Sequence, residues 1–222
     1  MTCTLVVNAD DLGASDGVNR GILHSHVHGI VTSASLMVDG PAVEEAVAHA
    51  RAHPALGIGL HWDLDGRDLA DAAAVRAELT RQLEAFGALT DRPPTHVDSH
   101  HHVHRRPEVL PIARELVAPL GVPLREEDEV TYVGGFYGQW EWQVTDLEHV
   151  RPEFLIRILR DEVREGWTEI GCHPGFVTMD FTSVYLAERE TEVETLCDPR
   201  VREAIDGLGI RLASYADFPR SR

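Results

Sequence analysis

Short apolar runs alternate with amphipathic segments along the chain, and this alternation limits the possible folds more than any other feature. The first run, Thr4 to Asn8, is rich in β-branched residues, and Val18 and Ile22 then form a helical stripe. The pattern predicts further strands over residues 30–38, 56–60, 95–99, 122–125, 168–172 and 210–214, and helices over 16–28, 44–53, 69–86, 108–116, 153–165, 188–196 and after Pro199.

Strands that are joined through helices form parallel sheets with right-handed crossovers. We therefore expect one α/β domain over residues 1–222, a TIM-like (β/α) barrel of about seven parallel strands that is imperfectly closed. A flat doubly wound sheet is the alternative. Residues 126–150 interrupt the alternation, and a loop of this length inside a compact domain is usually functional.

Charge and cysteine usage exclude several kinds of partner. The 37 acidic and 20 basic side chains give a formal net charge of −17, so neither nucleic acid nor an anionic membrane is expected as a partner. The three cysteines are too widely spaced for a disulfide framework. No signal peptide or membrane span is predicted, which indicates a cytoplasmic protein. The sequence leaves open whether the protein forms a homo-oligomer.

A histidine-rich stretch marks the predicted fourth strand. Five of the thirteen histidines fall between His96 and His104. In an extended strand His96, Asp98 and His100 share one face, as a divalent metal site requires. The consecutive histidines 100–102 cannot all face one way, so at least one is structural or exposed. Because short histidine tracts also occur as polar loops without a metal, this stretch alone does not decide between the two.

Polar residues follow most of the predicted strands at the point where each ends. In parallel α/β folds these ends lie on one face, where active sites are built. The residues expected to meet there are Asp10, Asp11, His61, His100, Arg125 and His173.

Each of these residues has a simpler explanation when it is taken alone. Asp10 and Asp11 could belong to the start of a helix, His61 could be a buried core histidine, and His173 could belong to a turn. Cys172 inside an apolar run is read as inert core. Their shared position at strand ends favours a metal-dependent active site.

An aspartate and two histidines around one ion leave positions for water and substrate. Such a site suits Zn²⁺, and Mg²⁺ or Mn²⁺ with more water ligands is the alternative. The ion lowers the pKa of bound water from ~15.7 toward 7 and polarises a carbonyl oxygen. A second carboxylate can then accept the proton of the water, and an imidazole can donate one to a leaving amine.

The sequence resembles the YdjC-like carbohydrate deacetylases, whose named members are the chitooligosaccharide deacetylases. The resemblance extends over nearly the whole chain. Its most specific parts are the aspartate pair and the histidine-rich stretch. The matching segments are residues 7–13, 29–33, 59–61, 95–104, 172–176 and 212–215.

The resemblance implies a TIM-like barrel that removes an N-acetyl group from an amino sugar with the help of one divalent metal ion, Mg²⁺ or Zn²⁺. It implies that the metal ligands are Asp11, His61 and His100. By similarity to polysaccharide deacetylases in general, Asp10 is the base and His173 is the acid. The substrate is then an N-acetylated sugar or oligosaccharide.

Further residues are predicted to support the site. Arg125 matches an arginine after the fifth strand of the family and is given an electrostatic role beside the base. Asp98 and His96 share the face of His100, so we expect them to orient the site. Tyr137 is a candidate substrate contact.

Two parts of the chain depart from the family pattern. The segment between His61 and His96 is shorter than in the chitooligosaccharide enzymes. Trp140 and Trp142 have no matched counterpart, and their rings either stack on a sugar or pack the loop onto the barrel. The competing functions are a metallophosphoesterase on a similar barrel and a catalytically inactive sugar-binding protein.

Overall fold

The computed structural model describes residues 2–127, 129–179 and 182–219. All strand pairs in its seven-stranded sheet are parallel, and the strand order is β4-β3-β2-β1-β6-β5. β6 pairs along one edge of β1. The other edge of β1 pairs with β7 at its first residues and with β2 further along. The strands are β1 (Cys3–Leu12), β2 (Ser33–Leu36), β3 (Gly57–Trp62), β4 (Val97–Ser99), β5 (Val130–Val133), β6 (Gly166–Cys172) and β7 (Arg211–Leu212).

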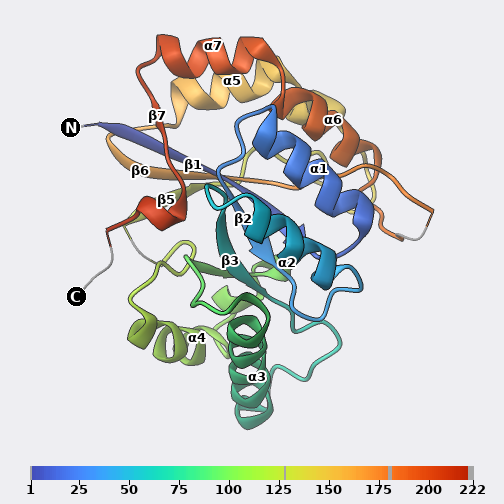
Figure 1. Ribbon diagram of the computed structural model, residues 1–222, viewed down its shortest axis with the longest axis vertical. Helices are drawn as coiled ribbons and strands as arrows, with labels where there is room; N and C mark the ends of the chain where they lie inside the picture. The colour runs from blue at the N-terminus through green and yellow to red at the C-terminus, as the bar shows by residue number, and fades with distance from the viewer. Residues whose placement is uncertain (1, 128, 180–181, 220–222) are drawn as a thin grey trace.

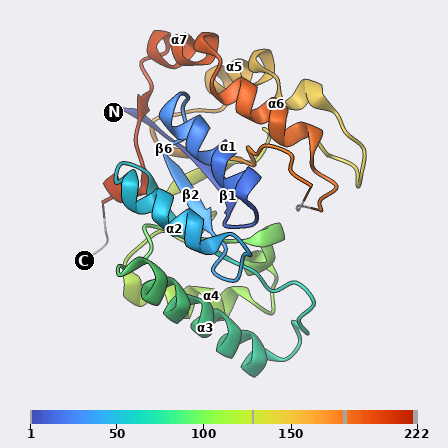
Figure 2. The same ribbon diagram turned by 45° about the vertical axis from the view of Figure 1, so that its right-hand side comes forward.

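The helices pack side by side around the sheet in the order α4-α3-α2-α1-α6-α5-α7 (Figures 1 and 2). α3 and α4 lie at the β4 end, while α5 and α7 lie at the β5 end, with α2, α1 and α6 between them. The helices are α1 (Asp16–Val27), α2 (Val43–Ala52), α3 (Ala72–Thr90), α4 (Leu110–Val117), α5 (Pro152–Asp161), α6 (Ala187–Leu196) and α7 (Pro199–Gly207), with short 3₁₀ turns η1 (His100–Arg105), η2 (Ala118–Leu120), η3 (Leu147–Val150) and η4 (Tyr215–Asp217).

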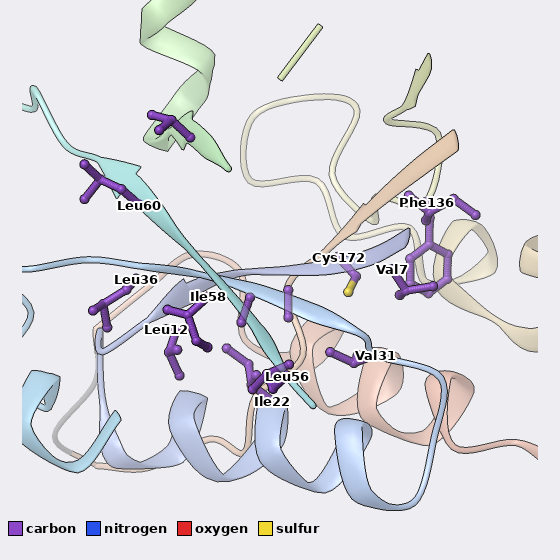
Figure 3. Packing of buried hydrophobic residues seen from close by; sticks show 14 of the residues in the cluster. Val7, Leu12, Ile22, Val31, Leu36, Leu56, Ile58, Leu60, Phe136 and Cys172 are labelled. Atoms are coloured by element: carbon purple, nitrogen blue, oxygen red, sulfur yellow. The ribbon is translucent and has the colours of Figure 1, made fainter. Parts of the chain in front are cut away.

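The two faces of the sheet differ in chemistry because side chains alternate along each strand. The face toward the helices is aliphatic. Figure 3 shows its strand residues gathered above Ile22 of α1. The inner face is polar and fully buried: it includes Asn8 of β1, Ser35 of β2, Asp98 of β4 and Glu169 of β6. The hydrophobic core therefore lies between sheet and helices, and the interior of the curled sheet holds a network of charged groups.

The prediction of an imperfectly closed TIM-like barrel is confirmed as a curled half-barrel of seven parallel strands. Within the described residues, no ladder joins β4 to β5, so the sheet stays open there. No helix of the described chain is both long enough and apolar enough to cross a membrane.

The predicted strand over residues 122–125 is wrong in its extent. Leu124 makes a single parallel bridge to Val97, and the fifth strand is instead Val130–Val133, inside the expected loop. Backbone bonds join Pro123 and Arg125 to Val97, and the chain then turns away at Glu126, whose φ is 63°. The segment is too short to be a strand, yet it places Arg125 directly beside β4.

Gly59 of β3 lets the His96 ring lie flat against the strand. A Cβ at residue 59 would lie 2.3–2.5 Å from three atoms of that ring. The ring cannot move aside freely, because Ser35 and Thr95 each hydrogen bond to it at 3.0 Å and the Tyr215 ring stacks on it at 4.1 Å.

We therefore expect Gly59→Ala to destabilise the protein by about 1–3 kcal/mol through overpacking. The matched control is Gly87→Ala in α3, where a Cβ meets no atom within 4 Å. This control should gain roughly 0.5–1 kcal/mol from reduced backbone entropy. Urea unfolding of both variants measures the difference, and equal stabilities would contradict the packing argument.

Candidate active site

Asp10 and Asp11 lie near the carboxyl end of β1 and both line the same cavity, although neighbouring strand residues normally face opposite ways. Asp11 has a φ of 66°, in the left-handed region, and the pairing of β1 with β2 shifts register between Ala9 and Leu12. This irregularity turns two consecutive buried carboxylates toward one site. Strained backbone of this kind concentrates at functional positions.

Asp11 Oδ1 faces two histidines that come from other strands. It lies 3.4 Å from Nε2 of His61, at the end of β3, and 3.3 Å from Nδ1 of His100, just after β4. Among the described residues, Oδ1 has no hydrogen-bond donor although it is buried. The other oxygen, Oδ2, accepts a hydrogen bond from Arg189 of α6 at 2.6 Å. A buried carboxylate oxygen without a donor, between two imidazole nitrogens, is the arrangement that a bound cation would complete.

Asp98 of β4 holds the His61 ring in place. Its Oδ1 lies 2.7 Å from His61 Nδ1, which leaves Nε2 directed toward Asp11. Burial lowers the pKa of His61, but the Asp98 and Asp11 carboxylates outweigh it and hold that pKa well above its ordinary value. The carboxylates around this imidazole therefore favour a positive charge at Nε2, which either a proton or a bound cation can supply.

The donor set of Asp11, His61 and His100 fits one divalent ion, because the three ligand atoms lie within 4.8 Å of one another. Two other groups meet the same spacing. In Asp10–His61–Asp98, both carboxylates already pair with Arg125. In Asp65–His100–His101, Asp65 and His101 are exposed to solvent. The first group alone contains the buried carboxylate oxygen without a donor.

Arg125 lies buried among three carboxylates. Its guanidinium donates to both oxygens of Asp10 at 2.7 and 2.8 Å, and to Glu169 Oε1 at 2.6 and 2.9 Å. It also forms an ion pair with Asp98 Oδ2 at 2.8 Å. Burial raises the pKa of Asp10, but Arg125 outweighs it, so the pKa lies below its ordinary value. Asp10 is consequently a fixed, ionised carboxylate at neutral pH.

His173 follows β6 and faces Asp10 from across the cavity, with 4.0 Å between its Nε2 and Asp10 Oδ2. Its ring packs edge-on against Tyr137 and Tyr185, each at 5.6 Å between centroids. Burial lowers the pKa of His173 to about 4, so the ring is neutral at neutral pH. The structure thus brings Tyr137 to the same wall, beside the predicted acid.

The remaining histidines of the rich stretch have separate surroundings. His96 is buried beneath Ser35 and Tyr215, and His104 lies between Ser99 and the backbone of Arg125. His101 is exposed. Burial lowers the pKa of His102, at the cavity wall beside Tyr132, to about 4. Of the five histidines between residues 96 and 104, only His100 contacts Asp11 among the described residues.

Sequence reasoning missed three residues that hold the site together. Glu169 of β6 binds Arg125 and accepts a hydrogen bond from Tyr215 at 2.5 Å. Arg189 of α6 binds Asp11, and Asn8 of β1 donates to Asp10 at 2.8 Å. Glu169 had a local signal, because a charged residue inside an otherwise apolar strand needs a partner. Arg189 had none, since it lies on a helix rich in charged residues.

One cavity of about 540 Å³ at the carboxyl ends of the strands is lined by the two aspartates, by His61, His100 and His173, and by Arg189. Asp10, Asp11 and His61 form its floor. Its walls come from the histidine-rich turn, from the segment after β5 and from the start of α6. This volume is in the range of small-molecule sites.

The fold and the cavity define an open α/β barrel with a candidate metal centre at the carboxyl ends of its strands. The family model for YdjC-like proteins matches residues 4–207, so the chain belongs to the YdjC-like family. The resemblance seen in the sequence motifs is thereby confirmed.

Two relatives match almost end to end. A carbohydrate deacetylase of Geobacillus stearothermophilus is 33% identical over 248 residues, covering 96% of this chain and 97% of the relative. A chitooligosaccharide deacetylase of Yersinia enterocolitica is 33% identical over 257 residues, covering 96% and 98%. Because 257 exceeds the 222 residues of this chain, that relative carries additional residues inside the matched region.

Solved structures share the fold. A putative cellobiose-phosphate cleavage protein from Enterococcus faecalis V583 is 29% identical, with a TM-score of 0.82 over 97% of this chain and 98% of that chain. A T48 deacetylase with substrate has a TM-score of 0.58 at 17% identity, covering 96% and 89%, and supports the fold alone.

The candidate metal centre can be tested without any substrate. We expect Zn²⁺ or Mg²⁺ added to metal-stripped protein to stabilise it, by about 2.7 kcal/mol at a hundredfold excess over Kd. Asp11→Asn should weaken binding by at least about tenfold, since even outer-shell partners matter that much. Asp65→Asn, in the exposed group, is the control and should bind normally. Titration calorimetry distinguishes the groups, and loss of binding only in the control would assign the ion to the exposed group.

The buried carboxyl of Glu169 should make stability depend on pH. Burial raises its pKa from 4.5 to about 7, even though Arg125 and Tyr215 lower it. The folded state therefore keeps a proton that the unfolded chain loses. The stability from this group is complete below pH 4.5 and is lost as the pH rises through 7.

Glu169→Gln cannot titrate and should lack this pH dependence. Between pH 4.5 and 7.5, its unfolding free energy should rise relative to wild type by roughly 3 kcal/mol. Urea unfolding at several pH values measures this difference. Glu203→Gln, at an exposed position, is the control for the loss of one carboxylate. A constant difference for Glu169→Gln would contradict the prediction.

Proposed function

We propose that this protein is a metal-dependent carbohydrate N-deacetylase, which hydrolyses the acetamide bond of an N-acetylated sugar. The observation that carries the proposal is the donor-free Asp11 Oδ1 between His61 and His100, directly beside an ionised Asp10. The names of the two relatives that match end to end, a carbohydrate deacetylase and a chitooligosaccharide deacetylase, support it.

Asp11, His61 and His100 would hold the divalent ion. A bound ion supplies Lewis-acid chemistry, because it makes a water ligand more acidic and polarises a carbonyl oxygen. Two imidazoles and one carboxylate oxygen favour Zn²⁺ on ligand preference, and Mg²⁺ is the other candidate. Asp98 keeps His61 in the tautomer that presents Nε2 to the ion.

Asp10 is the proposed base. Arg125 fixes both of its oxygens, so the carboxylate cannot rotate away from the cavity. Its lowered pKa keeps it ionised and ready to accept a proton at neutral pH. In the proposed reaction it takes the proton of the attacking water, as the water oxygen bonds to the carbonyl carbon of the acetamide.

His173 is the proposed acid. A neutral imidazole becomes an effective acid only after it gains a second ring proton, and the Asp10 carboxyl 4.0 Å from its Nε2 is the proposed source of that proton. The proton removed from water thereby reaches the sugar nitrogen as the carbon–nitrogen bond breaks. Acetate and a free amine are the products.

The metallophosphoesterase alternative is disfavoured by the charge of the cavity. Among its described lining residues the only guanidinium is that of Arg189, which is bound to Asp11. Phosphate recognition ordinarily needs several such groups. A catalytically inactive sugar-binding protein is disfavoured because the proposed ligands, the proposed base and the proposed acid all line one cavity.

The expected partner is an N-acetylated sugar, and neither nucleic acid nor a membrane. A cytoplasmic location stays a prediction, and the possibility of a homo-oligomer stays open.

Acetate release from N-acetylglucosamine and its β-1,4-linked oligomers tests the proposal. We expect turnover that chelator abolishes and Zn²⁺ or Mg²⁺ restores. Asp10→Asn and His173→Gln should each lower kcat by about 10²–10⁴-fold, as for general base and acid residues. Exposed Asp16→Asn is the control and should keep full activity. Turnover that survives chelation, or full activity of Asp10→Asn, would falsify the mechanism.

A further inference from the structure

Two tryptophans on one segment are exposed at the wall of the cavity. The aromatic segment, residues 134–146, follows β5, and the side chains of Trp140 and Trp142 are 61% and 77% exposed. Both line the cavity that contains Asp10 and Asp11. The Trp140 ring meets the His149 ring edge-on at 6.0 Å between centroids, yet neither tryptophan is buried in the core. Leaving two large apolar rings in contact with water is unfavourable, and such exposed aromatic surface often marks a place where a ligand binds.

Buried polar groups hold the aromatic segment in position from α6. Glu188, which is 1% exposed, accepts hydrogen bonds from Gln139 at 2.8 Å and from Thr145 at 2.5 Å. The Gly138 backbone donates to the Tyr185 hydroxyl at 3.0 Å, and that hydroxyl donates to Glu192 at 2.5 Å. The buried Glu188 carboxylate receives its hydrogen bonds from the aromatic segment. Moving the segment away would leave this carboxylate buried without partners, which is energetically unfavourable, so the segment is held in place.

The same helix also positions the catalytic groups. Arg189, next to Glu188, binds Asp11, and Glu192 one turn later accepts a hydrogen bond from the His173 backbone at 2.5 Å. The positions of the tryptophans and of the reacting groups are thus set by one rigid element. A ligand that reaches both would be held at a defined distance from the base.

The chemistry of this wall selects an uncharged sugar. Pyranose rings present apolar C–H faces that pack on indole rings, and hydroxyl groups that bind polar edges such as Gln139 and Tyr137. The chain contains no lysine and has a net charge of −17. Of the described residues around the cavity, Arg189 is the only arginine, and Asp11 engages it. Apart from the proposed metal ion and its histidine ligands, an anionic sugar would meet only the Asp11-bound Arg189 among the described lining residues.

We propose that Trp140 and Trp142 form a stacking subsite for an uncharged pyranose that is covalently linked to the acetylated sugar. This inference rests on the proposed deacetylase function and adds the residues that select chain length. The segment after β5 would then determine preference for an oligosaccharide over a monosaccharide. Glu188 and Tyr185 would be positioning residues for that preference.

The test compares kcat/KM for N-acetylglucosamine with that for its β-1,4-linked trimer. Trp140→Ala and Trp142→Ala should each lower kcat/KM for the trimer by about 3- to 10-fold, the loss expected for one stacking contact. Their kcat/KM for the monomer should stay within about twofold of wild type. The matched control is Val144→Ala, because Val144 is 52% exposed on the same segment but does not line this cavity.

Equal losses on both substrates, or no loss on the trimer, would overturn the subsite while leaving the deacetylase function intact. A 6-phosphorylated dimer that is turned over more efficiently than the uncharged dimer would overturn the assignment to an uncharged sugar. If wild type releases acetate from no substrate, the proposed function fails, and fluorescence decides on the subsite. Saturable quenching by the trimer that is lost in Trp142→Ala supports the subsite, and absence of quenching in wild type overturns it.

Discussion

The rest of the site depends on the ion pairs that the buried Arg125 guanidinium forms with three carboxylates. The guanidinium is buried with Asp10, Asp98 and Glu169, and an isolated charge in that position would cost several kcal/mol. Each of the three carboxylates in turn needs the guanidinium, because burial raises its pKa. One positive charge cannot balance three ionised carboxylates, and the raised pKa of Glu169 shows where the excess is relieved.

This arrangement connects parts of the site that look separate. Asp10 is the proposed base, while Asp98 orients the proposed ligand His61, and Arg125 touches both. The inner face of the sheet is therefore a single electrostatic unit. Through Asp98, which contacts both Arg125 and His61, this network reaches the proposed metal ligands at the carboxyl ends of the strands.

The alternation of strands and helices predicted the half-barrel, because each strand carries a local apolar signal, and strand ends predicted which residues would meet. The sequence could not assign the edges. Two segments were candidates for the fifth strand: the short apolar run before Arg125 and Val130–Val133, which also has strand-forming residues. The first segment cannot continue as a strand because the backbone turns away at Glu126, and this turn is not evident from the sequence. Arg189 and Glu188 were invisible for a different reason: their partners are distant in sequence, and charged residues on a helix are normally solvated. Ion pairs and hydrogen bonds between residues far apart in the sequence cannot be predicted from a local sequence pattern.

The left-handed backbone of Asp11 restricts how this site can change over evolution. Few side chains adopt that conformation easily, and aspartate and asparagine are among them. Glutamate offers the same ligand oxygen, but a longer side chain on a disfavoured backbone would both strain the turn and overshoot the two imidazoles. Asparagine keeps the turn and gives up the charge. Asparagine is thus the substitution that position 11 tolerates best, and it preserves the fold while weakening metal binding. A relative that has lost activity in this way can remain a well-folded protein.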